Sequence, residues 1–112
     1  MRKPIIAGNW KMNKTNSEAI ALANDLKRHL NDCVGVDVVI CPPFTALSEV
    51  AAVVDGSKID LGAQNIYFVK EGAYTGEISP LMLKDTGCQF IIIGHSERRA
   101  LFGETNEGVN QK

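Results

Sequence analysis

The chain has 112 residues, of which 45% are hydrophobic and 22% are charged, and its formal net charge is -1. This composition is typical of a folded globular domain and excludes a disordered chain. Twelve basic residues balance thirteen acidic ones, so we expect no nucleic-acid partner, whereas a small anionic substrate needs only one or two local cations.

The amino terminus lacks the features of a secretion signal, because Met1–Pro4 lead only into a short apolar run. A membrane span needs roughly 18 consecutive apolar residues, so we expect no membrane partner. Cys33, Cys41 and Cys88 are widely spaced and contain no CxxC pair. We interpret them as small buried side chains in a reducing compartment, and we predict a cytoplasmic protein.

Four short apolar runs predict β-strands. Several of them are nearly continuous in Ile and Val, a pattern that favours strands of a parallel sheet with both faces buried. The third run is the weakest of the four, because it contains Asp60 and Gly62. The runs occupy residues 5–10, 36–41, 59–64 and 89–93.

Two helices are predicted between the first three runs. Thr15 and Glu18 have the spacing of a capping box, and apolar residues at helical spacing follow as far as Leu30. Gly35 marks the end of this segment. The second helix has an apolar face between Leu47 and Val54 and ends at the following Asp-Gly pair.

Two further helices are predicted in the second half of the chain. Ser79 is expected to cap a short helix that has Pro80 in its first turn and Gly87 at its carboxyl end. A last helix is expected to begin near Thr105 and to continue to Lys112 without a stop signal.

The strands and helices alternate, with strands beginning at residues 5, 36, 59 and 89. A spacing of roughly 20–30 residues predicts four βα units joined by right-handed crossovers. An open doubly wound sheet and part of an eight-stranded barrel both fit this pattern. A whole barrel needs about 250 residues, so we expect residues 1–112 to be a single partial domain that is truncated within its last helix.

Functional side chains of parallel α/β folds gather at the carboxyl ends of the strands. Asn9 and Lys11 follow the first predicted strand, and His95 follows the fourth. Taken singly, a lysine in such a place is most often solvated surface, an asparagine a turn residue and a histidine structural. Their common edge favours a functional site without establishing one.

Five sequence motifs in order resemble those of the triosephosphate isomerase family, and together they extend over nearly the whole chain. They are Gly8-Asn9-Trp10-Lys11-Met12-Asn13, Cys41-Pro42-Pro43-Phe44, Gly62-Ala63-Gln64-Asn65, Gly72-Ala73-Tyr74-Thr75-Gly76-Glu77-Ile78-Ser79 and Ile93-Gly94-His95-Ser96-Glu97-Arg98-Arg99. The resemblance implies an α/β fold made of parallel (β/α) repeats, the first four units of a (β/α)8 TIM barrel.

The resemblance also implies an activity, the interconversion of dihydroxyacetone phosphate and D-glyceraldehyde 3-phosphate by enediol proton transfer, without metal or organic cofactor. Lys11 matches the catalytic lysine that holds the substrate phosphate, and Asn9 matches a residue that positions the substrate. His95 matches the electrophile that polarises the carbonyl, and Glu97 matches a carboxylate that pairs with the lysine. The residues from Ser96 onward would then open a short helix.

The long loop of residues 65–78 is implied to form a subunit interface. Thr75, Gly76 and Glu77 match the loop tip that the family inserts into the neighbouring subunit of a homodimer, although a Gly-flanked surface turn would look the same. The implied setting is the cytoplasm, in glycolysis and gluconeogenesis.

The family's general-base glutamate and most of its phosphate-binding loops follow later strands, which these 112 residues do not include. We therefore expect the chain alone to be inactive. The alternatives are a catalytically inactive half-barrel fragment and a small phosphate-binding α/β domain.

Overall fold

The computed structural model describes residues 2–112. It contains one four-stranded parallel sheet with strand order β1-β2-β3-β4. The strands are β1 (Ile5–Asn9), β2 (Asp37–Cys41), β3 (Ile59–Ala63) and β4 (Phe90–Ile91). Because neighbours in sequence are also neighbours in the sheet, the strands follow the order of a barrel wall, whereas a doubly wound sheet reverses its strand order at a switch point.

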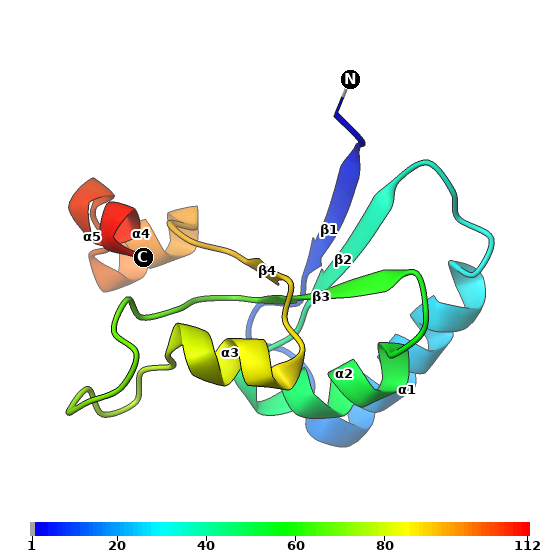
Figure 1. Ribbon diagram of the computed structural model, residues 1–112, viewed down its shortest axis with the longest axis horizontal. Coiled ribbons are helices and arrows are strands. Elements are labelled where there is room, and N and C mark those ends of the chain that lie inside the picture. The colour runs from blue at the N-terminus through cyan, green and yellow to red at the C-terminus, as the bar shows by residue number, and fades with distance from the viewer. Residues whose placement is uncertain (1) are drawn as a thin grey trace.

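The helices lie in the connections, as the alternating pattern predicts. They are α1 (Asn16–His29), the 3-10 turn η1 (Phe44–Ala46), α2 (Leu47–Val54), α3 (Pro80–Thr86), α4 (Ser96–Phe102) and α5 (Asn106–Gln111). The sheet twists strongly from β1 to β4, and α1, α2 and α3 cover its outer face (Figure 1). The result is a curled wall of four βα units.

The predicted caps at Thr15, Ser79 and Gly87 are confirmed, whereas α1 ends at His29, well before Gly35. The Glu18 carboxylate accepts hydrogen bonds from the backbone N–H of Thr15 at 3.0 Å and from its hydroxyl at 2.9 Å. Ser79 Oγ accepts the backbone N–H of Met82 at 3.2 Å, and Gly87 adopts φ 98° at the end of α3. These short-range signals locate helices because a cap satisfies backbone groups only a few residues away.

The hydrophobic core lies between α1, α2, α3 and the middle of the sheet. Leu47 and Val50 of α2 are fully buried, and they pack in one cluster with Ala19 and Ala23 of α1 and Leu61 of β3. The cysteines agree in part with the prediction, since Cys41 is buried whereas Cys33 and Cys88 are partly buried, and all three are free thiols.

The two outer strands differ from the prediction that the apolar runs form strands buried on both faces. Ile5 and Ile6 of β1 are more than half exposed, and Ile91 of β4 is also exposed. Strand β4 is moreover shorter than the predicted run of residues 89–93. Both strands form edges of an open sheet, so they have one hydrogen-bonded neighbour and an uncovered inner face.

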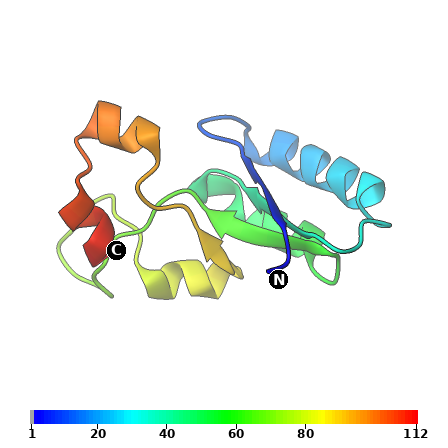
Figure 2. The same cartoon turned by 90° about the horizontal axis from the view of Figure 1, so that it is seen from above.

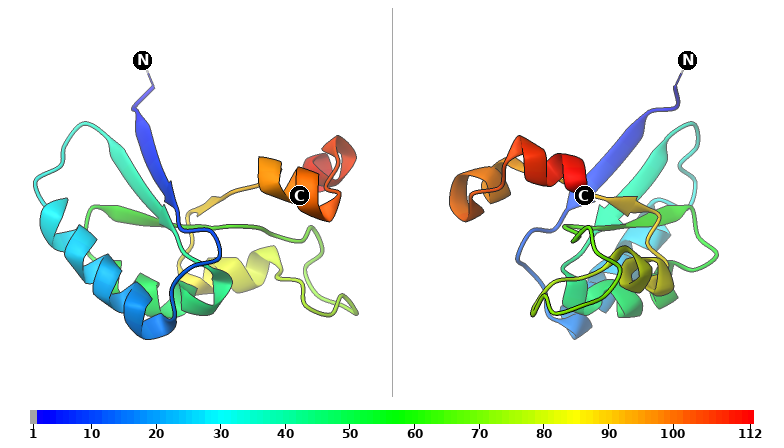
Figure 3. Two further views of the ribbon diagram at one scale, coloured as in Figure 1. Left: turned by 180° about the vertical axis from the view of Figure 1, so that it is seen from behind. Right: turned by 60° about the vertical axis from the view of Figure 1, so that its left-hand side comes forward.

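The carboxyl-terminal helices lie apart from the core. Helices α4 and α5 stand at the opposite end of the molecule from α1, beside the loop of residues 65–78 (Figures 2 and 3). The Cα radius of gyration is 14.6 Å, compared with about 13 Å for a compact domain of this length. The structure therefore has the open shape of half a barrel. Among residues 2–112, no helix is long and apolar enough to cross a membrane.

Candidate functional site

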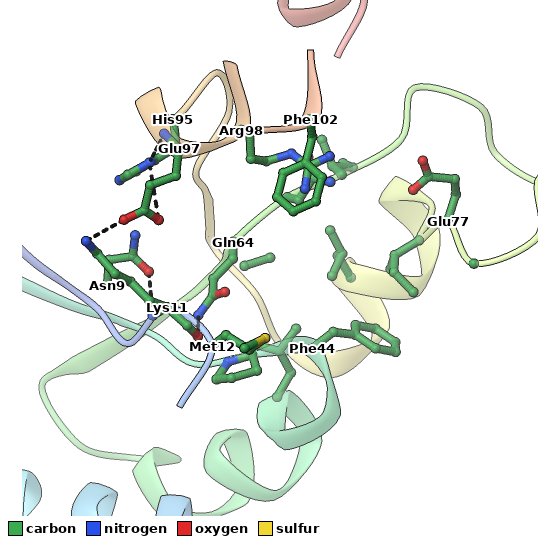
Figure 4. A pocket seen from close by; sticks show the side chains of 18 residues that line it. Asn9, Lys11, Met12, Phe44, Gln64, Glu77, His95, Glu97, Arg98 and Phe102 are labelled. Atoms are coloured by element: carbon green, nitrogen blue, oxygen red, sulfur yellow. Dashed lines mark hydrogen bonds and ion pairs between the residues drawn. The ribbon is translucent and has the colours of Figure 1, made fainter. Parts of the chain in front are cut away.

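The carboxyl ends of the outer strands bring the predicted polar residues together. Lys11 Nζ lies 2.6 Å from Glu97 Oε1, although the two residues are 86 positions apart in the chain. The backbone N–H of Glu97 donates to His95 Nδ1 at 3.0 Å. Asn9 lies beside Lys11, and its Oδ1 accepts the Lys11 backbone N–H at 2.9 Å (Figure 4).

The backbone of Lys11 is strained. Its φ is 57°, in the left-handed region that non-glycine residues seldom adopt. Its N–H donates to Asn9, and its carbonyl accepts from Gln64 Nε2 at 2.8 Å. Gln64 Nε2 also donates to the Cys41 carbonyl at 2.8 Å. Groups at the ends of β1, β2 and β3 therefore hold the strained turn that carries Lys11. Backbone strain of this kind is typical of functional sites.

His95 stands at the start of α4 and is the N-cap residue of this helix. A ring nitrogen that accepts a hydrogen bond carries no proton. Because Nδ1 accepts the Glu97 N–H, the neutral ring carries its proton on Nε2, which is then free to donate to a ligand. The expected short helix after His95 is confirmed as α4.

Glu97 is held as an ionised carboxylate and is a poor base in this arrangement. The hydrogen bond from Lys11 is the largest influence on the Glu97 pKa and lowers it, desolvation opposes it, and the charge of Lys11 acts in the same direction as the hydrogen bond. A carboxylate with a lowered pKa is a weak proton acceptor. Both side chains of the Lys11–Glu97 pair remain about half exposed, so a substrate can reach the lysine.

These residues line one end of a cavity of about 350 Å³. Gly76 and Glu77 contribute to the same cavity, whereas Thr75 lies outside its lining and is exposed. Glu77 lies on the far side of the cavity from His95 and Lys11 (Figure 4). The structure thus separates the predicted site residues into a polar cluster at one wall and a loop tip at the other.

Sequence reasoning missed a buried charged cluster beside this cavity. The Glu104 side chain is only 6% exposed, and its Oε2 accepts from Arg98 Nε at 2.8 Å and from Lys112 Nζ at 2.9 Å. Lys112 Nζ also donates to Asn65 Oδ1 at 2.7 Å. Burial alone would raise the pKa of Glu104, but these hydrogen bonds and ion pairs outweigh it and bring the pKa to about 2.

Gln64 was also missed, although its place directly after the third strand was the signal that could have found it. No comparable signal marks Glu104 or Lys112, which look in the sequence like ordinary charged surface residues. Within residues 2–112, no three His, Cys, Asp or Glu side chains are grouped as metal ligands would be.

The fold and the site together define a (β/α)-barrel protein with its polar residues at the carboxyl ends of the strands. The sequence model described as triosephosphate isomerase matches residues 4–112. The chain therefore belongs to the triosephosphate isomerase family.

Individual relatives agree with this assignment. The triosephosphate isomerase of Carboxydothermus hydrogenoformans is 60% identical over all 112 residues, and that of Dehalococcoides mccartyi is 57% identical over the same length. The crystal structure of the triosephosphate isomerase from Bartonella henselae superposes with a TM-score of 0.92 at 40% identity over 99% of this chain. The chain spans 45%, 44% and 46% of the lengths of these three proteins. Its fold is that of the first units of a TIM barrel.

Proposed function

We propose that this chain supplies the electrophile and the phosphate-binding cation of a triosephosphate isomerase, which interconverts dihydroxyacetone phosphate and D-glyceraldehyde 3-phosphate. The observation that carries the proposal is the juxtaposition of Lys11, Glu97 and His95 at one wall of the cavity. The family membership gives this geometry its substrate class.

Each side chain has a distinct part in the proposed reaction. His95 Nε2–H donates to the carbonyl oxygen of the triose phosphate and stabilises the negative charge that develops there in the enediol step. The Lys11 ammonium binds the phosphate as a compact point charge, and its hydrogen bond to Glu97 orients it. Asn9 positions the substrate and holds the Lys11 backbone.

The proton on carbon needs a base that these residues do not offer well. Lys11 lowers the pKa of Glu97, and Glu104 is buried in its own ion pairs. Glu77 lies across the cavity. Positioned general bases contribute roughly 10²–10⁴ in rate, so the 112 residues alone should show no turnover above solution background. The alternative function is a catalytically inactive half-barrel or a small phosphate-binding domain.

The test joins residues 1–112 to the part of the Carboxydothermus relative that lies beyond the matched region. A coupled assay with D-glyceraldehyde 3-phosphate should detect isomerase activity in this chimera and a large loss in its His95→Ala variant. Residues 1–112 alone serve as the control and should be inactive. A folded chimera without activity would contradict the proposed function. Activity of the isolated chain that disappears with His95→Ala would show that a base exists within it.

The partner proposed for the loop of residues 65–78 is a second subunit. Thr75, Gly76 and Glu77 are all exposed, and the neighbouring Phe102 on α4 is 69% exposed. Such a large exposed aromatic side chain is typical of interface cores. Glu77→Lys in the chimera should weaken a homodimer in sedimentation experiments, whereas an unchanged dimer at nanomolar concentration would exclude a central role for this loop. The proposed setting is cytoplasmic glycolysis and gluconeogenesis.

A further inference from the structure

Gly94 is held by side chains on both of its backbone polar groups. It connects β4 to His95 and adopts φ 65°, a left-handed conformation suited to glycine. Its N–H donates to Glu104 Oε1 at 3.0 Å, and its carbonyl accepts from Arg99 Nε at 2.8 Å. The carbonyl of Gly94 belongs to the peptide group that leads directly into His95, so the direction of this peptide also sets the direction in which His95 leaves the turn.

Arg99 also packs closely against Gly94. A Cβ atom placed on Gly94 would lie 2.9 Å from Arg99 Nη2 and 2.9 Å from Val109 Cγ2. Contacts below 3.0 Å require a neighbour to shift. The end of the Arg99 side chain can move aside, but Val109 of α5 also occupies the space that a side chain at Gly94 would need. The turn before His95 is thus confined sterically as well as by hydrogen bonds.

The guanidinium group has a second anchor outside the turn. Arg99 Nη1 donates to Asn106 Oδ1 at 2.7 Å, and Asn106 is the first residue of α5. Arg99 therefore bridges the peptide before His95 and the start of the next helix. An arginine suits this task because its donors form a rigid planar fork, whereas a lysine offers a single flexible ammonium. The side chain has no acidic partner among residues 2–112, so its contacts are with a carbonyl and an amide oxygen rather than an ion pair.

We propose that Arg99 is a positioning residue for His95, acting through the Gly94–His95 peptide group. The inference rests on the proposed isomerase function and adds a residue to it. Reacting groups must be held within a fraction of an ångström, and a misplacement of 1 Å can cost roughly 10²-fold in rate. Removal of the guanidinium group frees the Gly94 carbonyl and lets the imidazole drift from the substrate carbonyl.

The test uses the same chimera with Arg99→Met, which keeps a long apolar stem but removes both hydrogen bonds. We expect kcat to fall about tenfold while KM changes less than about twofold, because Asn9 and Lys11 are held at the end of β1, away from the turn that Arg99 supports, and still bind the phosphate. The matched control is Arg28→Met, which removes an exposed arginine that pairs with Asp25 on α1. This control should leave kcat, KM and the melting temperature unchanged.

Each outcome decides the proposal. A loss of kcat at unchanged KM and unchanged melting temperature supports it, and an Asn106→Ala variant should show a smaller loss in the same direction. A kcat within twofold of the parent overturns it, as does a raised KM at unchanged kcat. If Arg99→Met does not fold, the test uses Arg99→Lys, because lysine keeps the charge and the stem but cannot make both contacts. A folded Arg99→Lys variant with full kcat also overturns the proposal. An inactive parent chimera instead contradicts the proposed function itself.

Discussion

The two ends of this molecule are stabilised in different ways. Helices α1 and α2 bury alanine, leucine and valine against β2 and β3, with Leu47 and Val50 fully buried. Every residue of α4 and α5 is at least partly exposed, and these helices are held by Glu104, whose carboxylate joins Arg98, Lys112 and the Gly94 backbone. One end rests on an apolar core and the other on a polar network.

The proposed site lies where these two regions meet. Asn9 and Lys11 extend from the sheet that the apolar core supports, whereas His95 and Glu97 belong to the start of α4. The Lys11–Glu97 ion pair bridges them and is about half exposed. Exposed ion pairs contribute little to stability because both charges stay hydrated. The comparison therefore teaches that the Lys11–Glu97 pair brings the two sides of the site together while adding little to the stability of the contact between the two regions.

The largest expected effect is in the apolar region. Leu47→Ala should lower the free energy of unfolding by about 3 kcal/mol, because it removes a fully buried side chain and leaves a cavity. Leu101→Ala is the matched control in α4, where the leucine is 74% exposed, and should change stability by less than about 0.5 kcal/mol. Urea unfolding followed by circular dichroism measures both. Equal losses would mean that α4 has an apolar core of its own, and the contrast between the two ends of the molecule would then be wrong.

The polar region should respond most to Glu104→Gln. We expect a loss of about 2 kcal/mol, because the charge-assisted hydrogen bonds from Arg98 and Lys112 become neutral ones. Hydrogen exchange should show the loss in α4 and α5 before α1. Glu107→Gln is the control, since Glu107 is an exposed glutamate of α5, and it should have no measurable effect.

The same residue predicts a pH dependence. The pKa of Glu104 is about 2 in the folded chain, below the ordinary value of 4.5. A lowered pKa means that the folded state binds the proton less tightly than the unfolded state, so this stabilisation is fully present above about pH 4.5 and is lost as the pH falls towards 2. The melting temperature should decline over this range in the parent and less steeply in Glu104→Gln. Parallel curves would show that the polar network does not depend on this carboxylate.

A smaller effect, of opposite sign, is expected at Lys14. This exposed residue adopts φ 82° in the turn between β1 and α1, a conformation that glycine adopts without strain. Lys14→Gly should therefore raise the free energy of unfolding by about 1 kcal/mol. Lys14→Ala keeps the Cβ atom and should bring no gain. A destabilising Lys14→Gly would indicate that the lysine stem makes a contact worth more than the strain.

The smallest expected effect concerns the junction itself. A double-mutant cycle of Lys11→Met and Glu97→Gln should give a coupling in stability close to the limit of measurement, because both side chains are exposed. Urea unfolding of the four chains measures it. A large coupling would mean that this ion pair joins the two regions firmly, and the weak-junction interpretation would then be wrong.

The sequence by itself determined the elements whose signals are local. Capping residues such as Thr15, Ser79 and Gly87 located helix ends because they act on backbone groups within one turn. The spacing of apolar runs predicted four βα units, and the motifs around Lys11 and His95 indicated the site residues. These patterns can be recognised in the sequence alone because each depends on residues within a few positions of one another.

Only the tertiary structure decided which distant groups meet and which strands stay uncovered. The curl of the sheet brings Lys11 and Glu97, which are 86 positions apart in the chain, within hydrogen-bond distance. Nothing in the local sequence marks Glu104 as buried or Arg99 as the partner of Gly94. The exposure of Ile5 and the shortness of β4 likewise follow from their places at the sheet edges. Burial and pairing are properties of the whole arrangement, because a side chain's environment is made by residues far away in the chain.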